Sequence, residues 1–183
     1  YKILKPLINI LAGIPSIVYG YFGLKIVVPL VRNAIGGGGY NIVTTSLILG
    51  IMILPTIISI TENSLRAVPK SYYEGALALG ATKERAIFRT MFPAAASGIM
   101  TAIILGLGRA IGETAAITLI CGNAAQFPAA LTDPFITLAS AISSGMGYSS
   151  GLRQDALVAV ALVLFVFVLI ITFLVMLLKK KSR

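Results

Sequence analysis

Two charged residues lie four positions apart in a segment that is otherwise suited to a lipid environment. The segment "LGLGRAIGETAAI" covers residues 105–117 and contains Arg109 and Glu113. A charge at the centre of a bilayer costs at least about 2.5–3.5 kcal/mol, so both side chains should face a bundle interior or a water-filled path. Because residues spaced i, i+4 share one helix face, we expect these two to form a pair.

Two roles explain such a pair. One is a buried ion pair that locks two helices together. The other is part of an anion path, because a guanidinium presents a planar fork of donors that matches phosphate oxygens. In this second role Glu113 holds Arg109 until an anion arrives. Gly108 and Gly112 have the small-xxx-small spacing that permits close approach of another helix.

The sequence contains no pattern for catalysis or metal binding. The stretch "GALALGATK" at 75–83 does not end in the Gly-Lys-Ser/Thr of a phosphate-binding loop. The chain has no histidine and a single cysteine, Cys121, without clustered metal ligands. We therefore expect no enzyme activity, no metal and no cofactor on this chain, and interpret Cys121 as a small apolar filler.

Composition predicts an all-α, polytopic transmembrane bundle that forms one domain over residues 1–183. Hydrophobic residues make up 57% of the chain and charged residues only 11%, with a mean hydropathy of +0.95. A bilayer core about 30 Å thick needs about 20 helical residues. By this criterion we place four spans, at residues 7–31, 42–60, 93–122 and 156–178. The chain starts at Tyr1, so we expect further residues upstream. The stretch 123–155 is interpreted as an external loop.

The basic residues predict the orientation of the chain. Most of the 15 Lys and Arg residues lie at 2–5, 66–89 and 179–183, on one side of a four-span arrangement. The positive-inside rule places that side, with the C-terminus, in the cytoplasm. Topology and anionic lipid thus explain the net charge of +9 better than nucleic acid does. Glu62 and Arg66, again i, i+4, are interpreted as a structural pair near an inner gate.

The polar stretch 61–93 is predicted to contain two short helices outside the membrane. Pro69 suits a first helical turn, and Gly80 suits a left-handed cap after the last one. Thr82 then caps a second helix, and Pro93 suits the start of the next element. The stretch has too many apolar residues for a solvated loop, so it needs either bilayer or protein as a partner.

The segment "EGALALGATKERAIFRTMFP" at 74–93 resembles the EAA loop of binding-protein-dependent ABC importer permeases. The residues on the positions of that motif are Glu74, Ala76, Gly80 and Pro93. The residues that depart from it are Gly75, Thr90 and Phe92. The resemblance implies that this cytoplasmic loop is the coupling helix, which sits in a groove of the ATPase. The residues expected to make that contact are Glu74, Gly75, Ala76, Leu77, Gly80, Ala81, Thr82 and Arg85.

Three further stretches are similar to the permeases of phosphate-specific (Pst-type) ABC importers. They are "GIPSIVYGYFGL" at 13–24, "TENSLRAVPKSYYEGALALGAT" at 61–82 and "GRAIGETAA" at 108–116. The stretches "GLGRAIGETAAITLICGN" at 106–123 and "GYSSGLRQDAL" at 147–157 look closer to the PstC member than to PstA. The resemblance implies a type I importer fold with six spans, two of them upstream of Tyr1. It also places Arg109, Glu113 and Thr114 in a path for inorganic phosphate.

The same resemblance implies three protein partners. They are a second homologous permease subunit, an ATPase dimer that holds ATP and Mg²⁺, and an extracytoplasmic phosphate-binding protein. The alternative functions are a permease for another oxyanion (molybdate, sulfate or phosphonate), a secondary transporter or channel without an ATPase, and a purely structural membrane subunit. The EAA-like loop argues against the last two alternatives. Only the residues around Arg109 favour phosphate over another oxyanion.

Overall fold

The computed structural model describes residues 2–181, with side chains up to residue 177, and this region contains helices and no β-strand. The basic residues Lys179, Lys180, Lys181 and Arg183, used above to predict orientation, lie outside the described side chains. The helices are α1 Leu4–Gly13, α2 Ser16–Phe22, the π-helix η1 Gly23–Val27, α3 Val28–Ile35, α4 Ile42–Arg66, α5 Lys70–Ala78, α6 Lys83–Ala86, the π-helix η2 Ile87–Met91, α7 Phe92–Ala94, α8 Ala96–Gly112, α9 Ala115–Ile120, α10 Leu138–Gly145, the 3₁₀ turn η3 Met146–Tyr148 and α11 Leu152–Lys181.

Two single helices are long and apolar enough to cross a membrane, and both coincide with predicted spans. The first is α4, which begins where the Asn41 side chain accepts a hydrogen bond from the Thr44 N–H at 3.0 Å. The second lies in α11, over Leu152–Leu177, whose most apolar stretch contains no fully buried residue. The predicted spans at 42–60 and 156–178 are therefore confirmed as helices, each longer than predicted.

The predicted first span, residues 7–31, is not one straight helix. Its two halves, Leu4–Gly13 and Ser16–Ile35, are bent by 99° relative to each other. The bend falls at Ile14, which is extended (φ −72°, ψ 128°) because it precedes Pro15. The segment reaches membrane-spanning length only if both arms count as one broken span.

The predicted third span, residues 93–122, was wrong at both ends. Helix α8 begins at Ala96, after a 70° bend that separates it from Lys83–Ala94. It ends at Gly112, because Glu113 adopts an extended conformation (φ −69°, ψ 130°). The short helix α9 then starts a new direction.

Helices α4 and α8 run antiparallel and pack closely through two glycines of α8. A Cβ on Gly106 would lie 2.7 Å from the Ile57 side chain, and a Cβ on Gly98 would overlap Ser64. Gly108 and Gly112, whose spacing permits a close approach, make none within the described chain, since a Cβ at either position would meet no atom of another element within 4 Å. Only packing decides which glycines of α8 face α4.

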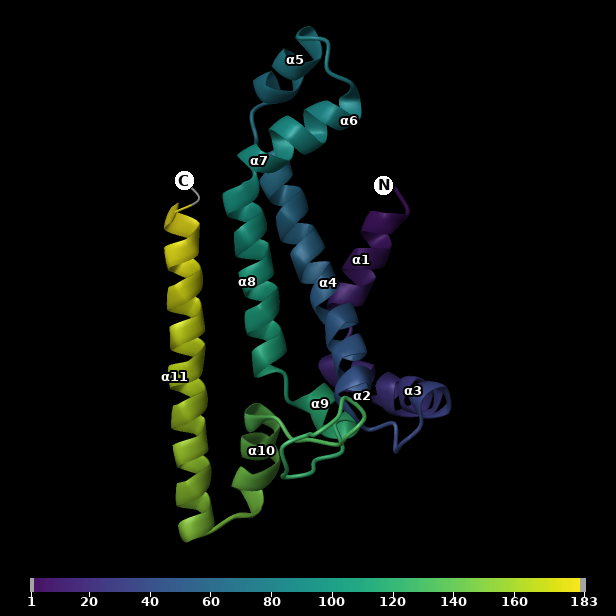
Figure 1. The fold of residues 1–183 in the computed structure, drawn as a ribbon, viewed down its shortest axis with the longest axis vertical. Helices are drawn as coiled ribbons and strands as arrows, with labels where there is room; N and C mark the ends of the chain where they lie inside the picture. The colour runs from purple at the N-terminus through teal and green to yellow at the C-terminus, as the bar shows by residue number, and fades with distance from the viewer. Residues whose placement is uncertain (1, 182–183) are drawn as a thin grey trace.

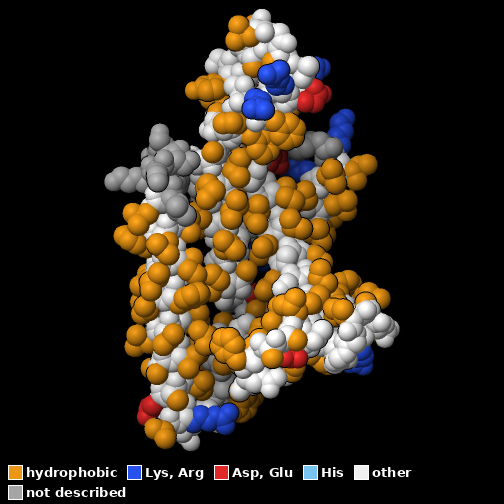
Figure 2. Space-filling model, viewed as in Figure 1, with side chains coloured by type: hydrophobic (Ala, Val, Ile, Leu, Met, Phe, Trp, Pro, Cys, Tyr) orange, Lys and Arg blue, Asp and Glu red, His pale blue; other side chains and the backbone are white. Residues whose placement is uncertain are grey.

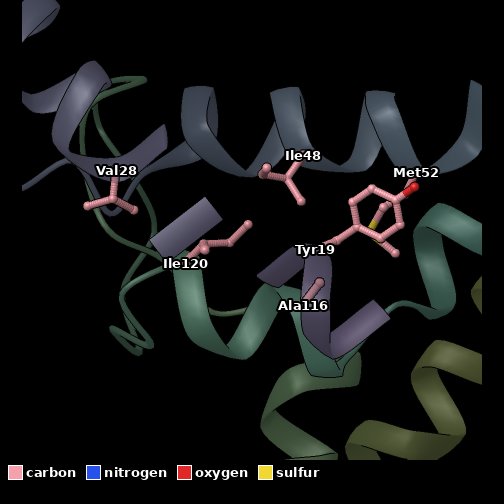
Figure 3. Packing of buried hydrophobic residues seen from close by; sticks show 6 residues of the cluster. All are labelled: Tyr19, Val28, Ile48, Met52, Ala116 and Ile120. Atoms are coloured by element: carbon pink, nitrogen blue, oxygen red, sulfur yellow. The ribbon is translucent and has the colours of Figure 1, made fainter. Parts of the chain in front are cut away.

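The buried core lies where the N-terminal helices meet α4 and α9. Figure 3 shows this cluster, in which Tyr19 points toward Met52 of α4. Tyr19 also donates its hydroxyl to the Leu11 carbonyl at 2.8 Å, which ties α2 to α1 across the bend. The residues of the cluster are Tyr19, Val28, Ile48, Met52, Ala116 and Ile120. Cys121, next to this core, is fully buried, as its interpretation as a filler requires.

The long helices separate two ends of different character. Figure 1 shows α5 and α6 at the end where α1 begins and α11 ends, while α3, α9 and α10 lie at the opposite end. Figure 2 shows hydrophobic side chains along the long helices and charged side chains mainly toward the ends. This distribution is typical of a membrane protein, because helices satisfy their own backbone hydrogen bonds and an apolar band between two polar ends can lie in lipid.

Candidate translocation site and coupling loop

Arg109 lies in the last turn of α8 and reaches across to α4. Its Nη1 donates a hydrogen bond to the Thr56 hydroxyl at 3.3 Å, and its side chain remains exposed on this chain. Thr56 stands near the middle of α4, which is the helix long enough to span a bilayer. The guanidinium therefore lies beside the middle of α4, and a charge at that depth of a bilayer-spanning helix is costly unless it is covered.

Glu113 does not pair with Arg109, so the predicted ion pair was wrong. Because α8 ends at Gly112, the two residues do not share a helix face. The Glu113 carboxylate instead accepts a hydrogen bond from the Ala116 N–H at 3.1 Å, at the start of α9. It satisfies one of the N–H groups that a helix start leaves free. Among the described residues, the ion pairs involve Glu62 and not Glu113.

Thr114 lies at the break between α8 and α9 and is half-buried. Its carbonyl accepts hydrogen bonds from the N–H and the hydroxyl of Thr118, at 2.9 and 2.8 Å. The Thr118 hydroxyl also lies 2.8 Å from the Ser140 hydroxyl of α10, so the break is tied to the neighbouring helix. The break between α8 and α9 thus contains Glu113 and Thr114 and follows the last turn of α8, which carries Arg109.

The predicted helix–glycine–helix geometry of residues 69–86 is confirmed. Gly80 has a φ of +83°, and two hydrogen bonds, Gly80 N–H to Leu77 and Ala81 N–H to Ala76, close the end of α5 as a Schellman motif. Thr82 then caps α6, because its hydroxyl accepts from the Arg85 N–H at 3.3 Å.

The loop of α5 and α6 exposes apolar side chains that nothing in the described chain covers. Leu79, beside the turn, is 91% exposed, and Phe88 is 66% exposed although its ring stacks on Phe92 at a centroid distance of 5.4 Å. Of the residues expected to contact an ATPase, those exposed are Glu74, Gly75, Gly80, Thr82 and Arg85, and those half-buried are Ala76, Leu77 and Ala81. The surface is available for docking.

The predicted pair of Glu62 and Arg66 is present, and it has a third member. The Glu62 Oε1 lies 2.8 Å from Arg66 Nε and 3.0 Å from Lys5 Nζ of α1. Lys5 was missed because no local spacing connects α1 to α4. This carboxylate therefore joins the N-terminal helix to the end of α4 from which the loop of α5 and α6 departs.

Thr56 was also missed by sequence reasoning. Its only signal is a hydroxyl inside an apolar span, next to Pro55, and the span contains other hydroxyl residues such as Thr45 and Ser64. Nothing in the local pattern selects Thr56 among them, because its contact with Arg109 joins residues 53 positions apart.

Fold and site together define an integral membrane component of a transport system. Comparison of the sequence with protein families leads to the same class, since the profile of the family described as "Binding-protein-dependent transport system inner membrane component" matches residues 1–183. The chain belongs to this family.

Several curated proteins are similar to this chain. The probable ABC transporter permease protein YqgH of Bacillus subtilis is 38% identical over 94% of the chain and 58% of the relative. The phosphate transport system permease proteins PstC of Haemophilus influenzae and Pasteurella multocida are 38% and 35% identical, over 87% and 90% of the chain and 57% and 58% of their own lengths. The chain thus spans somewhat more than half the length of these relatives. No solved structure matches it.

Proposed function

We propose that this chain belongs to the membrane permease subunit of an ATP-driven importer of inorganic phosphate. The observation that carries the proposal is Arg109, an exposed guanidinium held at mid-depth between α4 and the break after α8. A planar cationic fork at that depth suits an oxyanion in transit. The names of the relatives, which include phosphate transport permeases, favour phosphate among the oxyanions.

Glu113 and Thr114 contribute to the same path by their position at the break. Glu113 keeps α9 capped, and its negative charge at the break discourages tight trapping of an anion. Molybdate, sulfate and phosphonate are the competing substrates, because a guanidinium by itself does not distinguish them from phosphate.

The loop of α5 and α6 couples this path to a cytoplasmic ATPase dimer. Exposed Leu79 and the rigid turn at Gly80 support this role, since a fixed apolar protrusion transmits movement better than a flexible one. ATP and Mg²⁺ belong to the ATPase and not to this chain. Glu62, with Lys5 and Arg66, forms an inner gate beside the loop.

The remaining parts of the proposal concern the assembly. The end that carries α5 and α6 faces the cytoplasm, which the basic residues of that loop support. A second, homologous permease subunit covers the exposed face of Arg109. An extracytoplasmic binding protein delivers phosphate to the end that carries α9 and α10.

Uptake of radiolabelled phosphate tests the proposal in cells that express the full-length subunit with its transporter. Deletion of the subunit should abolish high-affinity uptake. Arg109→Gln should do the same while the transporter still assembles, and Arg109→Lys should restore little, because it lacks the fork. Lys25→Gln, a charge removed outside the site, serves as the control. Unlabelled molybdate, sulfate and a phosphonate serve as competitors. Full uptake by Arg109→Gln, or stronger competition by another oxyanion than by phosphate, would overturn the assignment.

A further inference from the structure

Thr56 uses its hydroxyl differently from other threonines in these helices. Thr45, Thr118 and Thr172 each donate the hydroxyl to the carbonyl four residues earlier, at 2.8 or 2.9 Å. This intrahelical bond is the usual outcome for threonine inside a helix. The Thr56 hydroxyl accepts from Arg109 and donates to no group among the described residues. Its proton therefore remains available beside the guanidinium.

The position of Thr56 is set by backbone packing and not by the arginine. The neighbouring Ile57 lies against Gly106, which is buried on α8 one turn before Arg109. Because a larger residue of α8 would not fit against Ile57 at this point, the packing favours one register of α4 against α8. Thr56 therefore stays opposite the end of α8 whether or not Arg109 moves.

We propose that Thr56 and Arg109 together form the oxyanion-binding position, with Thr56 as a second binding residue that donates its O–H to an oxyanion oxygen. The inference rests on the proposed transport function and adds a residue to it. The guanidinium offers five N–H donors, of which one contacts Thr56. A tetrahedral oxyanion that docks on the remaining donors comes within reach of the hydroxyl.

The contact between Thr56 and Arg109 also gives both side chains a hydrogen-bond partner when no anion is bound. Without an anion, the Thr56 oxygen accepts from the guanidinium and keeps it from reaching toward lipid. With an anion bound, the same hydroxyl turns its proton to the ligand while its oxygen still accepts from Arg109. No new buried polar group is left unpaired in either state.

Three threonine variants of the full-length transporter test the inference in proteoliposomes. Thr56→Val removes the hydroxyl at nearly constant shape, Thr56→Ser keeps it, and Thr172→Val makes the same exchange on α11 away from the site. Labelled phosphate uptake gives KM and kcat, and co-purification with the ATPase reports assembly. Since a hydrogen bond to a charged group contributes about 1.5–3 kcal/mol, we expect Thr56→Val to raise the KM for phosphate at least about tenfold. We expect Thr56→Ser and Thr172→Val to stay within about twofold of the wild-type KM.

The outcomes separate this inference from the proposed function. If Arg109→Gln abolishes uptake while Thr56→Val keeps the wild-type KM, the inference fails and the proposed function stands. If Arg109→Gln transports normally, both fail. An equal loss in Thr56→Val and Thr56→Ser would also contradict the inference, because serine retains the donor. If Thr56→Val does not assemble, phosphate binding to Thr56→Ser and Thr56→Ala in detergent decides the matter: the inference requires weaker binding by Thr56→Ala alone.

Discussion

A substitution at Gly80 should act through the backbone conformation of the turn and not through side-chain contacts. Gly80 has a φ of +83°, and a Cβ built on it meets no described atom within 4 Å. The cost of Gly80→Val within this chain is therefore conformational and not steric. An L-residue in the left-handed region costs about 1–2 kcal/mol, and a β-branched side chain lies at the upper end. This cost lowers the population of the native turn roughly tenfold.

The assay compares membrane insertion with coupling. We expect Gly80→Val to insert normally, because the turn lies outside the long helices, but to co-purify with less ATPase and to stimulate it less. Gly80→Asn should lose less than Gly80→Val, since asparagine tolerates positive φ better. Gly147→Val makes the same exchange at a glycine with ordinary φ and open space, in the turn that follows α10, and should leave coupling intact. Wild-type ATPase association and uptake in Gly80→Val would refute the reasoning.

Three further predictions follow from local geometry. In a mutant cycle, Arg109→Gln with Glu113→Gln should show no more phosphate uptake than Arg109→Gln alone, because no ion pair joins the two residues; rescue by the double change would contradict this geometry. Gly20→Ala should destabilise the detergent-purified protein by about 1–3 kcal/mol in unfolding experiments, since its Cβ would lie 2.7 Å from the α9 backbone, whereas Gly50→Ala, with open space, should not. Thr82→Ala should weaken α6 by about 1 kcal/mol, seen as faster amide exchange over residues 83–86, and Thr82→Ser should retain the cap; equal exchange in all three proteins would count against the cap.

Features that depend on residues close together in the sequence were predictable, and contacts between distant segments were not. The glycine turn, the Thr82 cap and the Glu62–Arg66 pair were all predictable, because each depends on residues within a few positions of one another. The spans at α4 and α11 were predictable for a similar reason, since length and hydropathy alone determine whether a helix suits a bilayer. Docking to an ATPase stays a prediction, although the shape of the loop is confirmed.

Contacts between helices could not be read from the chain. The small-xxx-small spacing drew attention to Gly108 and Gly112, but Gly98 and Gly106 are the glycines of α8 that face α4. An apolar helix of small and large residues has several faces able to pack, and only the fit to Ile57 and its neighbours selects one. The packing of α8 on α4 also brings Arg109 to Thr56, and the packing of α1 on α4 brings Lys5 to Glu62.

The sequence by itself determined the class of protein, the two long spans and the local form of the loop of α5 and α6, because these depend on composition and on short spacings. The tertiary structure decided what the two charges of residues 109 and 113 do. The i, i+4 spacing indicates a pair only while the helix continues, and α8 ends between them. Once Glu113 turns to cap α9, Arg109 takes its partner from α4 across the bundle. The partner of Arg109 therefore depends on how the helices pack, and residue spacing within one segment cannot predict it.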